Sequence, residues 1–88
     1  MSDVTVYMFS SSACAPCQHI KPTICELRED YANFTWVDTE LRTPEAARFD
    51  VKAIPTMVIT YGNTVLGKHS GASAMGYYSL LKKATQQS

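Results

Sequence analysis

Two cysteines spaced three residues apart, Cys14 and Cys17, are the residues of this sequence best suited to chemistry. They enclose Ala15 and Pro16, and they lie where a predicted strand gives way to a predicted helix. The free N–H groups and the positive dipole end of a helix N-terminus stabilise an anion, here a thiolate on Cys14. Such a thiolate attacks a disulfide to form a mixed disulfide, and Cys17 can then attack Cys14 and release the reduced product. The spacing therefore predicts thiol–disulfide exchange.

A metal site is the alternative use of such a pair. Structural zinc needs four ligands, usually two cysteine pairs or a cysteine pair with a histidine pair. The remaining candidates are Cys25, His19 and His69, and their spacing matches neither pattern. We therefore expect redox chemistry, with no metal and no bound cofactor.

The third cysteine, Cys25, lies eight residues beyond Cys17 on the same predicted helix. That separation is about 12 Å along the helix axis, which exceeds the reach of a disulfide. Free cysteine commonly behaves as a small buried hydrophobe. We expect Cys25 to be buried and to take no part in the reaction.

Composition limits the classes of protein to consider. The 88 residues are 45% hydrophobic and 18% charged, which predicts a single globular domain over residues 1–88. Eight basic and eight acidic side chains cancel without forming a run, so nucleic-acid binding is not expected. Apolar stretches are shorter than the ~20 residues that span a membrane. The N-terminus lacks the pattern of a signal peptide, and the odd number of cysteines does not suit a secreted disulfide scaffold, so we expect a cytoplasmic monomer.

Seven segments have the periodicity of strands or helices, in the order strand, helix, strand, helix, strand, strand, helix. Thr43 and Ser73 are suited to cap the second and third helices, and Gly62-Asn63 is suited to a hairpin turn. Pro22 should kink the first helix without ending it, because the apolar spacing continues beyond it. The segments are Val4–Phe9, Ala15–Tyr31, Phe34–Val37, Thr43–Phe49, Thr56–Tyr61, Thr64–His69 and a last helix after Ser73 with Tyr77, Tyr78, Leu81 and Ala84 facing inward.

This order predicts an α/β fold with a four-stranded mixed sheet and three helices. The first strand, helix and strand form a βαβ unit, whose two strands are parallel with a right-handed crossover. The closing hairpin must be antiparallel. Helices on both faces of the sheet give the simplest packing.

Four short motifs resemble those of the thioredoxin/glutaredoxin superfamily over nearly the whole chain. The motifs are Cys14-Ala15-Pro16-Cys17, Pro22 in the helix, Ala53-Ile54-Pro55-Thr56 before a strand, and Gly71-Ala72. They are similar to those of thioredoxin, whereas the absence of an additional leading strand and helix is similar to the shorter glutaredoxins. The resemblance implies a minimal thioredoxin fold, βαβαββα.

The resemblance also implies a function. It predicts a cis bond before Pro55, beside the cysteines, and substrate docking on Ala15, Pro16, Ile54, Pro55 and Gly71. Substrates would be proteins with disulfides, among which ribonucleotide reductase is a common client of this family. Electrons would come from an NADPH-dependent thioredoxin reductase or from glutathione.

Two departures from the family bear on mechanism. Met8 stands where thioredoxins carry a buried aspartate, and Trp36 stands where they carry its lysine partner, so the family's proton relay is not expected. The segment after Gly71 lacks the acidic pair with which glutaredoxins hold glutathione. A glutathione-dependent reductase, a metal or iron–sulfur module using Cys14, and a redox-silent subunit of a complex remain as alternatives.

Overall fold

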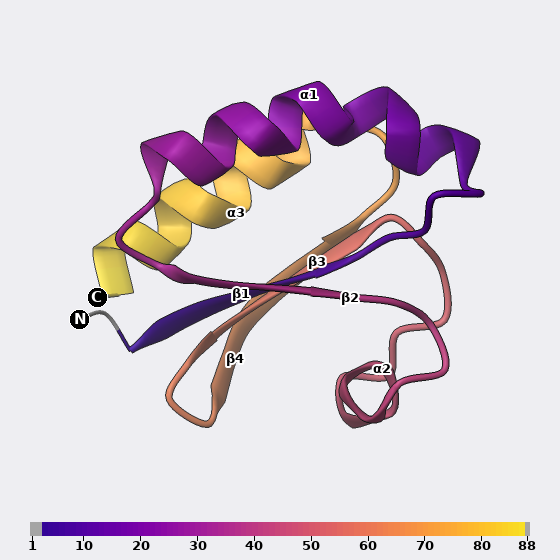
Figure 1. Ribbon diagram of the computed structural model, residues 1–88. Coiled ribbons are helices and arrows are strands. Elements are labelled where there is room, and N and C mark those ends of the chain that lie inside the picture. Colours follow the sequence, from indigo (N-terminus) through magenta and orange to yellow (C-terminus); the bar gives the residue numbers. More distant parts are fainter. Residues whose placement is uncertain (1–2, 88) are drawn as a thin grey trace.

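The computed structural model describes residues 3–87, which form four strands and three helices (Figure 1). The elements follow the predicted order. They are β1 (Val4–Phe9), α1 (Ala15–Asp30), β2 (Thr35–Thr39), α2 (Pro44–Arg48), β3 (Thr56–Tyr61), β4 (Thr64–Ser70) and α3 (Ala74–Gln87).

The four strands form one mixed sheet in the order β2-β1-β3-β4. β1 is parallel to β2 and antiparallel to β3, and β3 is antiparallel to β4. Gly62 has a φ of 60° in the tight turn between β3 and β4, an angle that glycine adopts without steric cost. The predicted fold class, with its parallel βαβ unit and its closing hairpin, is confirmed.

The helices cover both faces of the sheet: α1 and α3 lie side by side on one face, and α2 lies on the other (Figure 1). Side chains of β1 alternate between these faces, as those of a buried strand must. Val4, Val6 and Met8 join the larger hydrophobic cluster with α1 and α3. Phe9 joins the smaller cluster that packs against α2.

Two predicted details were wrong. The inward face of α3 uses Leu80 in place of Tyr78, which is 41% exposed, because a helix turns by about 100° per residue and Tyr78 is one step away from Tyr77. The second strand begins at Thr35 and ends at Thr39, since it pairs in register with β1 from Thr5↔Thr35 to Phe9↔Thr39.

Strand register brings three loops together at one edge of the sheet. Phe9, the last residue of β1, pairs with Thr56, the first residue of β3. Thr56 pairs in turn with Ser70, the last residue of β4. The loops after β1, before β3 and after β4 therefore meet, and these loops carry the predicted site residues.

Candidate active site

Cys14 is the N-cap residue of α1 and is joined to Cys17 by a disulfide. The two Cα atoms are 5.2 Å apart. The N–H of Cys17 donates to the Cys14 sulfur over 3.2 Å. Cys17 is 4% exposed, whereas Cys14 is half-buried. Cys14 is thus the more accessible sulfur of the pair, and it lies at a helix N-terminus that favours negative charge.

The local sequence explains how α1 begins there. Cys14 has an extended backbone, and its carbonyl accepts the first helical hydrogen bond, from the N–H of Gln18 over 3.1 Å. Pro16 lies in the first turn, where the missing N–H of proline costs nothing. Residues 15–18 contain no acidic side chain, so the positive end of the helix dipole is not offset by a neighbouring carboxylate. Ala15 and Pro16 are both exposed between the cysteines.

The Ile54–Pro55 peptide bond is cis and lies beside the disulfide. The Ile54 carbonyl oxygen is 3.9 Å from the sulfur of Cys14. In the disulfide form that sulfur carries no proton, so this is a contact; in the reduced protein the thiol can donate to the carbonyl. Pro55 is buried, whereas Ala53 is exposed and Ile54 is half-buried.

Gly71 completes the predicted set on the neighbouring loop. Its φ of 100° lies in a region that other residues rarely adopt. Its N–H donates to the Pro55 carbonyl over 3.0 Å. The structure therefore brings Cys14, Cys17, Ile54, Pro55 and Gly71 to one place.

A cavity of about 220 Å³ lies behind the cysteines, between α1 and the first two strands. Met8 and Cys17 are both among the residues that line it. Its titratable groups are Lys21, Cys25 and Arg28 from α1 and Asp38 from β2.

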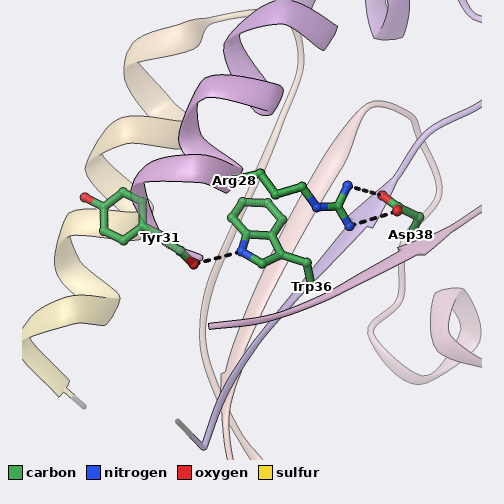
Figure 2. A network of polar contacts seen from close by, with 4 residues as sticks. All are labelled: Arg28, Tyr31, Trp36 and Asp38. Carbon is green, nitrogen blue, oxygen red and sulfur yellow. Dashed lines mark hydrogen bonds and ion pairs between the residues drawn. The ribbon is translucent and has the colours of Figure 1, made fainter. Parts of the chain in front are cut away.

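Arg28 and Asp38 form a bidentate ion pair across the end of this cavity, with N···O distances of 3.1 and 2.8 Å (Figure 2). The guanidinium also lies over the Trp36 ring, 5.2 Å from its centre. The Trp36 ring nitrogen donates to the Tyr31 carbonyl over 3.0 Å. These contacts join the C-terminal part of α1 to β2. They therefore help to position the helix whose N-terminus carries the cysteines.

Cys25 is exposed, so the expectation of a buried residue was wrong. The inward face of α1 is formed by Cys17, Ile20, Ile24 and Leu27. Cys25 directly follows Ile24 and is therefore turned away from the core by about 100°.

Tyr77 is a site residue that sequence reasoning assigned only to the core. Its side chain is fully buried, and its hydroxyl donates to the Gly71 carbonyl and lies 3.4 Å from the Pro55 carbonyl. Burial raises the pKa of Tyr77 from 10.0 to about 12, so the hydroxyl stays protonated as a donor. A signal was present, because a buried tyrosine usually finds a partner for its hydroxyl.

Residues 3–87 contain no group of three or more histidine, cysteine, aspartate or glutamate side chains placed to hold a metal ion. None of the helices in this part of the chain has the length and apolar character needed to cross a membrane.

Comparison with known proteins agrees with the geometry. The sequence matches the Thioredoxin family over residues 1–83. It is 36% identical to bovine thioredoxin over 72 residues, which cover 80% of this chain and 69% of the bovine protein. It is 36% identical to thioredoxin of Staphylococcus saprophyticus over 61 residues, which cover 66% of this chain and 59% of that protein.

Solved structures show the same likeness. Mitochondrial thioredoxin 3 of Saccharomyces cerevisiae, in its oxidised form, is 26% identical and aligns with a TM-score of 0.81 over 93% of this chain and 79% of the yeast chain. Thioredoxin of Trypanosoma brucei brucei aligns with a TM-score of 0.85 over 97% of this chain and 78% of its own, at 19% identity, and so supports the fold. Because the family match extends over most of the chain, this protein belongs to the thioredoxin family.

Proposed function

We propose that the protein reduces disulfide bonds of other proteins, with Cys14 as the attacking thiol and Cys17 as the resolving thiol. One observation carries the assignment: the more accessible sulfur, Cys14, caps α1 and accepts the N–H of Cys17 over 3.2 Å. A hydrogen bond to sulfur and a helix N-terminus both stabilise a thiolate, the form that attacks a disulfide.

The reaction transfers two electrons in two exchanges. The Cys14 thiolate attacks one sulfur of a substrate disulfide, forms a mixed disulfide and expels the other substrate sulfur as a thiolate, which takes a proton from water. Cys17 then gives its proton to water and attacks the Cys14 sulfur, which expels the second substrate sulfur as a thiolate that takes a proton from water. The protein is left with the Cys14–Cys17 disulfide, the state of this structure. An external donor of two electrons must reduce it again.

Substrate docking is proposed on the edge beside Cys14. Ala53 and Ile54 directly precede the cis peptide bond, and their backbone lies where a substrate strand can pair with it. Ala15 and Pro16 flank the sulfur on one side and Gly71 lies on the other loop. All these residues are uncharged, which suits a surface that accepts many protein segments.

The proposal also covers the electron donor and the cellular compartment. The thioredoxin-like motifs favour an NADPH-dependent thioredoxin reductase over glutathione as the donor. The proposed location is the cytoplasm, because in a reducing compartment a close cysteine pair cycles and does not remain a permanent disulfide.

The test is a reduction assay with insulin as the disulfide substrate and two alternative donor systems. We expect turnover with NADPH and thioredoxin reductase, and less with NADPH, glutathione and glutathione reductase. Cys17→Ser should lose turnover and accumulate a mixed disulfide with substrate, visible by mass spectrometry. Cys25→Ser, the matched control on the same helix, should retain turnover. An inactive wild-type protein, or a mixed disulfide on Cys25, would overturn the assignment.

A further inference from the structure

The Tyr77 hydroxyl connects the core to the edge proposed for docking. The Tyr77 ring belongs to the large hydrophobic cluster under α1 and α3. Its hydroxyl leaves that cluster, donates to the Gly71 carbonyl and approaches the Pro55 carbonyl at 3.4 Å. One side chain on a helix thus contacts both loops that border Cys14.

The two loops are also joined to each other by hydrogen bonds. Gly71 N–H donates to the Pro55 carbonyl over 3.0 Å. The Thr56 hydroxyl donates to the Ala53 carbonyl over 2.7 Å, so the Ser70 hydroxyl, 2.7 Å from Thr56, donates to it in turn. Ile54 lies between Ala53 and Pro55, whose carbonyls accept these hydrogen bonds, and its own carbonyl faces Cys14.

The His69 ring packs against the Tyr77 ring. The two rings meet edge to face, with centres 4.5 Å apart and planes at 86°. A ring nitrogen of His69 lies 3.2 Å from the Ser73 carbonyl, which holds the imidazole at the start of α3. The space for that ring exists because residue 76 is glycine: a Cβ there would lie 2.0 to 2.4 Å from atoms of the imidazole.

We propose that Tyr77 is a positioning residue for substrate docking: its hydroxyl holds the Pro55 and Gly71 carbonyls, and this keeps the adjoining Ala53–Ile54 backbone in place beside Cys14, where an extended protein segment can pair with it. This inference rests on the proposed function. A docking edge held in its bound shape loses less entropy when substrate binds. The benefit applies to substrates that use the edge, which are polypeptides. A small disulfide that reaches only the Cys14 sulfur gains nothing from it.

The test compares Tyr77→Phe with Tyr78→Phe, a control that removes the hydroxyl of the next, exposed tyrosine of the same helix. Each variant is assayed with insulin and with a small aryl disulfide. For Tyr77→Phe we expect the KM for insulin to rise about three- to tenfold, the loss that corresponds to one hydrogen bond. We expect kcat and the rate with the aryl disulfide to stay within about twofold of wild type. Tyr78→Phe should match wild type with both substrates.

Amide hydrogen exchange of the oxidised proteins gives a readout that does not depend on activity. We expect the Gly71 N–H, which donates to Pro55, to exchange faster in Tyr77→Phe than in Tyr78→Phe. Unchanged exchange, an unchanged KM for insulin, or an equal loss with both substrates would overturn the positioning role while the proposed function stands. A wild-type protein that reduces neither disulfide would overturn the proposed function itself, and the docking role with it.

Discussion

The Ile54 carbonyl oxygen lies 3.9 Å from the Cys14 sulfur, although the two residues are 40 positions apart in the chain. They meet because β1 and β3 are antiparallel neighbours, with Phe9 opposite Thr56 at the end of the pair. In the proposed reaction, a substrate sulfur that approaches Cys14 also comes close to the backbone of Ile54. Cys14 is half-buried and Cys17 is 4% exposed, which supports Cys14 as the thiol that reacts first in the proposed reaction.

Alkylation of the reduced protein should modify Cys14 before Cys17. At pH 7 we expect Cys14 to react about tenfold faster or more, because it lies at a helix N-terminus whereas Cys17 is buried. Because Cys25 is exposed, the experiment uses Cys25→Ser, and peptide mapping identifies the labelled site. Preferential labelling of Cys17 would reverse the assigned roles.

The cysteine site could be predicted from sequence because its parts are local. Periodicity placed the cysteine pair at a strand–helix junction and the Ile-Pro-Thr segment before a strand, whereas the meeting of the two was implied by the resemblance to thioredoxin. The same periodicity places Cys25 outside the stripe of Ile20, Ile24 and Leu27, so its exposure was available from the sequence.

The contacts of Tyr77 and Arg28 were not predictable in this way. Periodicity finds an inward face but does not decide between the adjacent residues Tyr77 and Tyr78 at its border. Which carbonyls a buried hydroxyl meets, and that Arg28 of α1 pairs with Asp38 of β2, depend on tertiary packing.

Met8→Asp tests whether a charge at position 8 changes the pH at which the cysteine thiols ionise. Met8 is 4% exposed, lines the same cavity as Cys17 and pairs in register with Asp38. Once ionised, a carboxylate there repels a thiolate, so we expect the thiolate absorbance at 240 nm to appear at higher pH than in wild type. Met8→Asn is the matched control, since it buries a polar group that does not titrate. Identical titration curves for all three well-folded proteins would show that position 8 does not face the cysteines.

The same substitution should make stability depend on pH. Burial, and next the neighbouring Asp38, raise the folded-state pKa of the new carboxyl above its unfolded value of about 4. Below about pH 4 both states are protonated and Met8→Asp should be as stable as Met8→Asn. As pH rises, the unfolded state ionises first, and each unit of pKa difference costs about 1.4 kcal/mol of unfolding free energy. Urea unfolding from pH 3 to pH 8 measures this, and a constant difference between the two variants would contradict it.

Alkaline pH should destabilise the protein through Tyr77. Its pKa is raised from 10.0 to about 12 by burial, so the folded state keeps a proton that the unfolded state loses. The stabilisation is complete below pH 10 and is lost as pH rises towards 12, a change of about 2 to 3 kcal/mol. Tyr77→Phe should lack this component, and Tyr78→Phe should keep it. Parallel stability curves for the two variants between pH 9 and pH 12 would refute the assignment.

Replacement of Gly76 by alanine should lower the stability of the wild-type protein and raise the stability of the His69→Ala variant. In the wild-type protein the new Cβ would lie 2.0 to 2.4 Å from the His69 ring, so the imidazole must leave its place against Tyr77 and the variant should be less stable. In His69→Ala the space is free, and alanine should stabilise α3 by about 0.5 to 1 kcal/mol because it is a better helix former than glycine. Urea unfolding of the two single variants and the double variant measures the coupling as a double-mutant cycle. An equal effect of Gly76→Ala in both backgrounds would mean that glycine is not needed to seat His69.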